Sequence, residues 1–319
     1  MRAFVILVLL WTAVTGGCTT ARPQHATPPP PPPIKPVVSS RPIIDFSKGA
    51  GGFPLSSDSL PSTPEALVES LTAGYKARVQ VPETVIPVIV AGQNYPRLDA
   101  LLVDLSDGQI RPAFRPNMFK SAVTLDEALQ VKYLHYVARP LRYVDGSTNL
   151  RIVAHDVKLG LLRGRGDTAA LVMTEAHDGH VQFDVRLDDI RTMLMTSAKN
   201  TANRGGYHVN DVQVKLTSAD SRSLACELHV SGFWLLLPTS FKITGRIDID
   251  GAQNAHLSNV GCSGEDVGGL IFAGFIDSAI KKYDGRIMPL ATFPGGKIKI
   301  QDLHIAVDDS LRLDVAFGS

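Results

Sequence analysis

Residues 266–283 read DVGGLIFAGFIDSAIKKY, and this stretch decides the fold. Ser263 has the spacing of a helix N-cap with Asp266 at the third helical position, so we expect a helix that runs to about Tyr283. Polar side chains are scarce until Lys281 and Lys282. Most of the circumference of this helix must therefore be covered by other parts of the chain.

The sequence around this helix has the period of β-strands. From residue 149 onward, apolar residues recur at every second position, which is typical of strands with one buried face. The pattern predicts two meanders separated by a helix over about residues 189–199, with a hairpin turn at Asp178-Gly179 in the first meander. Two closing strands follow at residues 297–307 and 311–317. A shift in apolar parity predicts a β-bulge near Gln301-Asp302 in the first of them.

The stretch before residue 149 is harder to assign. Thr63 followed by Pro64 and an apolar stripe through Tyr75 predicts a short, one-sided helix. Thr124 and Glu127 have the spacing of a capping box, which predicts a second helix of two or three turns.

The order of elements in the second half also carries a family resemblance. A strand at residues 241–249 is followed by a short strand at 256–260, the long helix, a basic-apolar-Pro-Leu segment at 286–290 and a closing strand at 297–303. This order resembles the TULIP superfamily of tubular lipid-binding proteins. The resemblance implies an α+β fold in which a highly twisted antiparallel β-sheet, built of meanders, is rolled around the long apolar helix.

Such a fold leaves a groove between helix and strands that binds lipid acyl chains. Each buried methylene contributes about 0.8 kcal/mol, so an acyl chain needs no specific polar contact to bind there. The alternative is that these side chains belong to an ordinary core. The candidate groove residues are Leu270, Ile271, Phe275, Ala279, Phe183, Val185, Ile247 and Phe317.

A second apolar run is a candidate for membrane contact. Phe233, Trp234, Leu235 and Leu236 follow one another between two predicted strands, and at a hairpin tip they would form an exposed apolar patch. Tryptophan suits the level of the lipid headgroups. A bulged strand buried in the core is the alternative.

The N-terminus has the pattern of a signal peptide. Arg2 precedes an apolar run that is too short to span a bilayer, and Gly16-Gly17-Cys18 resembles the lipobox of bacterial lipoproteins. This resemblance implies that Cys18 is acylated with chains such as palmitate. Thr19 rather than aspartate after the cysteine resembles an outer-membrane sorting signal, which implies an outer-membrane lipoprotein that faces the periplasm.

A proline-rich segment follows the cysteine. Residues 28–33 are all proline, so we expect residues 18–61 to form an extended, disordered tether rather than part of the folded domain.

Charge and cysteine content limit which binding partners and which disulfide the sequence predicts. The chain has 32 basic and 31 acidic residues and a net charge of +1, and no basic run suggests a nucleic-acid partner. Besides Cys18, only Cys226 and Cys262 are present. They are a candidate disulfide in an oxidising compartment, and a buried free thiol is the alternative for Cys226.

Catalytic and metal-binding motifs are weak. Gly164 to Ala169 fits a nucleotide-binding fingerprint, but the residues after it alternate like a strand, which indicates a hairpin loop. Glu175, His177, Asp178 and His180 cluster at a turn without further residues that complete a metal site. We therefore predict no enzyme activity, no cofactor and no metal.

These observations divide the chain into a signal peptide at residues 1–17, an acylated tether at 18–61, an N-terminal part of the domain at 62–148 and a TULIP-like lipid-binding domain at 149–319. The predicted function is to bind or transfer lipid acyl chains in the periplasm without bond chemistry. The alternative is a non-enzymatic scaffold or assembly factor of a cell-envelope complex, with an envelope protein as partner. Whether residues 62–148 form a separate module stays open at this point.

Overall fold

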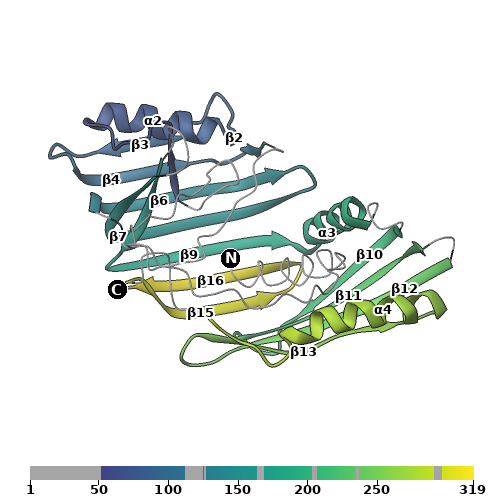
Figure 1. The fold of residues 1–319 in the computed structure, drawn as a ribbon. Helices are drawn as coiled ribbons and strands as arrows, with labels where there is room; N and C mark the ends of the chain where they lie inside the picture. The colour runs from purple at the N-terminus through teal and green to yellow at the C-terminus, as the bar shows by residue number, and fades with distance from the viewer. Residues whose placement is uncertain are drawn as a thin grey trace, which may run out of the picture.

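Two β-sheets carry most of the described chain, and the helices pack against them (Figure 1). The computed structural model describes residues 52–111, 125, 127–163, 169–202, 207–234, 237–290 and 297–319. The predicted signal peptide, Cys18 and the polyproline run lie outside these residues. The predicted α+β class is confirmed.

The larger sheet has 11 strands and the smaller has five. The larger sheet contains β1 (Phe53–Leu55), β2 (Val79–Gln80), β3 (Val88–Ala91), β4 (Arg97–Asp104), β5 (Gln109–Ile110), β6 (Glu127–Tyr143), β7 (Gly146–Arg163), β8 (Ala169–Glu175), β9 (Asp178–Arg186), β15 (Lys299–Val307) and β16 (Ser310–Gly318). The smaller sheet contains β10 (Tyr207–Thr217), β11 (Ser223–Trp234), β12 (Leu237–Ile249), β13 (Asn254–Gly264) and β14 (Ile287–Pro289). The helices are α2 (Pro64–Lys76), α3 (Leu187–Ala202), α4 (Val267–Ile280) and the 3₁₀ turn η2 (Lys281–Tyr283).

Several predicted elements are confirmed. The Thr63 hydroxyl accepts a hydrogen bond from the backbone N–H of Ala66 and caps α2. The smaller sheet is a meander in chain order, from β10 to β14. The predicted bulge in the closing hairpin is also present, as a register shift between Ile300 and Asp302 in β15.

The helix predicted from Thr124 and Glu127 is wrong, because residues 127–143 form strand β6. This strand pairs with β4 and with β7, and Leu129, Val131 and Leu134 are each 1% exposed. Pairing on both sides and burial outweigh the local capping signal.

The hairpin turn predicted at Asp178-Gly179 is also wrong. β8 and β9 pair with successive halves of the same long strand, β7, so the chain keeps its direction between them. Gly179 has a packing role instead, because a Cβ atom at this position would overlap the ring of Phe317.

Residues 62–148 complete the larger sheet. β6 lies before the predicted boundary, which falls inside β7 three residues after its start, and the two strands pair along most of their length. The tether is also shorter than predicted, since Phe53–Leu55 forms β1, pairs with β8 and is buried.

The long apolar helix lies against one sheet face only. α4 contacts β12 and β13, and in Figure 1 it lies on the front of the smaller sheet with no other helix or strand in front of it. The expectation that most of its circumference is covered is therefore wrong.

Candidate functional site

An aromatic cluster fixes α4 beside the tip of the β11–β12 hairpin. The ring of Phe272 stacks on Tyr207, with centroids 5.1 Å apart and planes inclined by 18°. The rings of Phe241 and Trp234 lie 5.5 Å and 6.1 Å from Phe272. Burial, with Asp266 nearby, raises the pKa of Tyr207 to about 12, and its hydroxyl donates to the carbonyl of Thr239 at 3.0 Å.

Glycines let the start of α4 approach the sheet backbone. A Cβ atom at Gly269 would overlap the carbonyl of Ser240, and one at Gly268 would lie 2.5 Å from the carbonyl of Pro238. Together with Ala273, Ile276 and Ile280, these glycines form the buried side of the helix. The small residues therefore identify which side of α4 faces the sheet.

One hydrogen bond caps the start of the helix, and another ties its last turns to the sheet. The Asp266 carboxylate accepts from the N–H of Gly269 at 2.6 Å and caps α4, a role predicted for Ser263, which lies in β13 instead. The Asp277 carboxylate accepts from the N–H of Cys262 in β13 at 3.0 Å. These contacts make α4 a fixed part of the smaller sheet.

The outward side of α4 is apolar and exposed. Val267 is 76% exposed, Leu270 64%, Ile271 48% and Phe275 71%. Large apolar side chains with such exposure cost free energy in water, and when they gather in one place they typically mark a contact surface.

The tip of the β11–β12 hairpin extends this surface. Leu237 is 49% exposed and pairs with Trp234, which is half-buried against Phe272. Phe233, 42% exposed, lies at the same tip but on the opposite face of the sheet, because side chains alternate along a strand. Leu237 precedes Pro238, which touches Gly268, so the tip adjoins Val267. We name the six exposed residues the apolar patch: Phe233, Leu237, Val267, Leu270, Ile271 and Phe275.

The membrane-contact candidates thus lie at a strand tip. Phe233 and Trp234 end β11, whereas Leu235 and Leu236 lie outside the described residues.

The eight groove candidates do not line one cavity. Three of them belong to the apolar patch, and Ala279 is half-buried on α4. Ile247 is buried on β12 of the smaller sheet. The others are core residues of the larger sheet: Phe183, Val185 and Phe317.

An apolar hollow lies over β11, β12 and β13 of the smaller sheet. It measures about 20 Å³ and is lined by Ile247 together with Leu224, Cys226, Leu228, Ile243, Thr244, Gly245 and Leu257. This volume has room for about one water molecule, so the hollow does not accommodate an acyl chain.

The two described cysteines do not form a disulfide. Cys226 lies opposite Gly245 and Cys262 opposite Ile243, so β12 separates them. Two strand spacings amount to roughly 9.5 Å, beyond the Cα separation of about 7 Å that a disulfide allows. Burial raises the pKa of each thiol to about 12, which keeps both thiols protonated at neutral pH.

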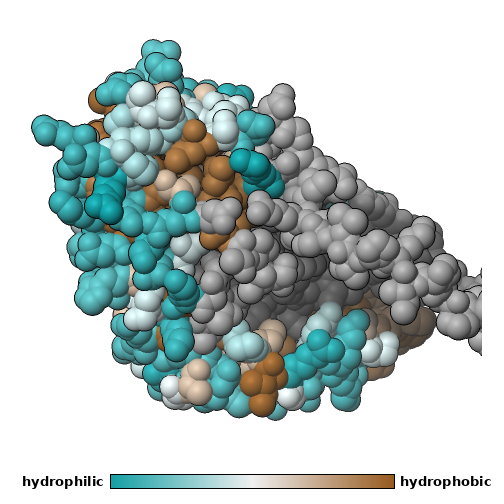
Figure 2. Space-filling view, turned by 60° about the vertical axis from the view of Figure 1, so that its left-hand side comes forward, coloured by the Kyte–Doolittle hydropathy of each residue, from teal (hydrophilic) through white to brown (hydrophobic). Residues whose placement is uncertain are grey.

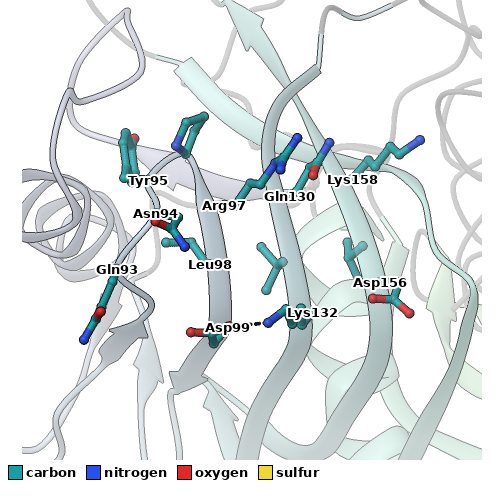
Figure 3. A pocket seen from close by; sticks show the side chains of 13 residues that line it. Gln93, Asn94, Tyr95, Arg97, Leu98, Asp99, Gln130, Lys132, Asp156 and Lys158 are labelled. Carbon is teal, nitrogen blue, oxygen red and sulfur yellow. Dashed lines mark hydrogen bonds and ion pairs between the residues drawn. The ribbon is translucent and has the colours of Figure 1, made fainter.

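A second hollow, of about 750 Å³, lies over β4, β6 and β7 (Figure 3). Arg97, Gln130 and Lys158 form a row in register across these strands. On the same face, Lys132 binds Asp99 at 2.6 Å. The lining mixes both charge signs on an open sheet face and gives no apolar contact surface of the kind that α4 presents. Hydrophilic side chains also predominate on the face shown in Figure 2.

The weak polar motifs are separated by the fold. His155 binds Asp178 at 2.6 Å, His180 lies 3.6 Å from Asp314, and Glu175 binds Lys158 and Lys297. Among the described residues, no three His, Cys, Asp or Glu side chains gather in a way that suits a metal ion. Gly164 and the four residues after it lie outside the described residues, between the paired Arg163 and Ala169.

Sequence reasoning missed two parts of this site. Val267 and Leu237 were not among the candidates, although both adjoin residues that were. The Gly268-Gly269 pair was the available signal, because small residues mark the side of a helix that packs closely and so leave the opposite side for other contacts.

Comparison of the chain with protein-family models, curated proteins and solved structures gave no match. In the described part, no helix has both the length and the apolar character needed to cross a bilayer.

Proposed function

We propose that this protein is a lipid-anchored protein of the cell envelope that binds the acyl region of a membrane with the apolar patch and performs no bond chemistry. The exposure of four large apolar side chains on one side of α4 carries this proposal. In this proposal the exposed side of α4 contacts the acyl region of the membrane directly. Lipid contact therefore requires neither a closed groove nor a sheet rolled fully around α4.

A membrane is the occupant that fits the patch best. The described chain begins at Gly52, 34 positions after Cys18, and a segment of that length spans at most about 120 Å. If Cys18 is acylated, the patch stays within this distance of the bilayer. A tethered surface meets its partner at an effective concentration in the millimolar range, so even weak contacts become populated.

The apolar patch also supplies a second attachment. Acyl chains on Cys18 would hold the protein at the membrane, but through a tether of this length they do not fix how the domain is oriented. Each apolar side chain that leaves water contributes about 1.5–3 kcal/mol when fully buried. The patch would therefore hold the domain against the membrane surface in one orientation.

A scaffold that docks an apolar surface of another envelope protein is the second candidate. The small size of the hollow beside Ile247 favours it over lipid carriage, because about 20 Å³ holds no acyl chain. The two candidates differ in whether pure lipid suffices as the partner.

Tryptophan quenching tests the lipid proposal. The chain has two tryptophans, and Trp11 lies in the predicted signal peptide, so Trp234 is the only tryptophan of the acylated protein that begins at Cys18. The full chain, attached to vesicles that contain brominated lipid, should show quenching of Trp234. Leu270→Asn combined with Phe275→Asn should abolish it, because each lost apolar contact shifts the docking equilibrium about tenfold or more.

The matched control replaces equally exposed apolar residues far from the patch. Ile86 is 67% exposed and Val144 64%, and Ile86→Asn with Val144→Asn should leave the quenching unchanged. Absence of quenching in the parent chain would overturn the lipid proposal in favour of a protein partner.

A further inference from the structure

The exposed side of α4, continued by the 3₁₀ turn η2, changes from apolar to basic along the chain. Val267, Ile271 and Phe275 follow one another at a spacing of four, and Ser278 and Lys282 continue the same side at spacings of three and four. Lys281, next to this line, is 69% exposed and lies 3.6 Å from Asp277. One face of the helix thus presents hydrocarbon at its start and ammonium groups at its end.

Arg286 adds a positioned guanidinium to this end. Its Nε donates to the carbonyl of Lys282 at 2.8 Å, and its guanidinium lies 5.0 Å from the ring centre of Tyr283. The ammonium of Lys282 lies 5.2 Å from the same ring. Both cations therefore lie beside the half-buried ring of Tyr283.

Such a pair suits a phosphate. A guanidinium offers parallel N–H donors that match phosphate oxygens, and an ammonium adds a point charge. Of the acidic groups nearby, Asp277 accepts from Cys262 and lies 3.6 Å from Lys281, and Asp284 accepts from Val260. The two backbone contacts hold these carboxylates toward β13, where Val260 and Cys262 lie.

We propose that Lys281, Lys282 and Arg286 bind the headgroup phosphates of anionic lipids, so that α4 docks tilted, with its apolar start and the β11–β12 tip deepest in the bilayer. This proposal rests on the proposed function, since it names the lipid class and the orientation of the same contact. The apolar start of α4 would then lie among the acyl chains, and the cations after its end would lie at the level of the headgroup phosphates.

The test compares vesicles of zwitterionic lipid with vesicles in which part of the lipid is phosphatidylglycerol. Docking of the acylated chain, which begins at Cys18, is read from Trp234 quenching by brominated lipid. We expect stronger docking on the anionic vesicles, with the gain removed by high salt. Lys282→Gln with Arg286→Gln should lower docking on anionic vesicles about fivefold for each cation removed and leave docking on zwitterionic vesicles unchanged.

Lys76→Gln with Arg97→Gln is the matched control, because both residues are exposed on the larger-sheet side and the same charge is removed. It should retain the full anionic gain, and thermal unfolding should show that both variants remain folded. The inference is overturned if the Lys282/Arg286 variant keeps the anionic gain while the Leu270/Phe275 variant still fails to dock. If the Leu270/Phe275 variant docks like the parent on zwitterionic vesicles, the proposed function itself fails.

Discussion

Gly269 places the backbone of α4 directly against that of β12. A methyl group on residue 269 would overlap the carbonyl of Ser240 in β12. This carbonyl cannot move without breaking hydrogen bonds of the sheet. Gly274 lies one and a half turns further along the helix, is exposed, and has open space where a Cβ atom would be. Two glycines of one helix therefore have opposite roles.

Substituting each glycine by alanine should shift stability in opposite directions. Gly269→Ala should lower the free energy of unfolding by about 1–3 kcal/mol, because the added methyl overpacks the helix against the strand. Gly274→Ala should raise it by about 0.5–1 kcal/mol, since glycine in a helix interior costs conformational entropy. Urea denaturation monitored by circular dichroism measures both changes. An equal effect of the two substitutions would show that the close approach of α4 to β12 is absent.

At the level of elements, Arg222 joins the two sheets. Its guanidinium donates to the carbonyls of Ile249 and Asp250 and to the side chain of Gln253, and it lies 3.4 Å from the Asp302 carboxylate in β15. One side chain at the start of β11 thus holds the β12–β13 turn and an edge strand of the larger sheet.

Arg222→Met should loosen this junction. The loss of several hydrogen bonds to a charged donor should cost about 2–3 kcal/mol of unfolding free energy, since the carbonyls lose a partner in a partly buried site. Amide exchange in β14 and β15 should quicken most. Arg186→Met is the control, because the 3.8 Å pair of Arg186 with Asp188 is exposed and contributes little. Equal losses in the two variants would argue against a junction at Arg222.

The elements differ in how far the sequence predicts them. α2 and the smaller-sheet meander follow from local caps, periodicity and turns, and contacts inside each element enforce them. The break between β8 and β9 follows instead from β7, whose 18 residues give both strands one partner. The residues near Asp178 carry no information about the length of β7, which lies earlier in the chain. The sequence around Asp178 therefore does not predict this break.

The candidate site shows the same limit. Leu270, Ile271 and Phe275 stood out as apolar residues with a functional role, and their place on one side of a helix follows from periodicity. Their exposure does not, because whether a helix side is covered depends on which distant strands pack there. The glycine contacts with Ser240 and Pro238 decide this, and they exist only once β12 and α4 are in place.

At the scale of the whole molecule, the larger sheet unites the two ends of the described chain. β1 near the start pairs with β8, and β16 at the end pairs with β9. Both partners lie along β7, which pairs with β6 on its other side. The predicted boundary after residue 148 therefore passes through the middle of a continuous sheet whose strands share one hydrophobic core.

A fragment of residues 149–319 should consequently fail to fold, whereas residues 52–319 should unfold in one cooperative transition. Without β6, the long β7 loses its backbone partners on one side, and an unpaired strand edge invites aggregation. The core also loses Leu129, Val131 and Leu134, each of which is 1% exposed in the intact chain. Each such residue contributes about 1.5–3 kcal/mol, which together approaches the whole stability of a typical domain, about 5–15 kcal/mol. Amide dispersion in NMR spectra and calorimetric unfolding distinguish the two fragments. A sharp, reversible transition in residues 149–319 would mean that this half supplies its own core and that β6 only covers it.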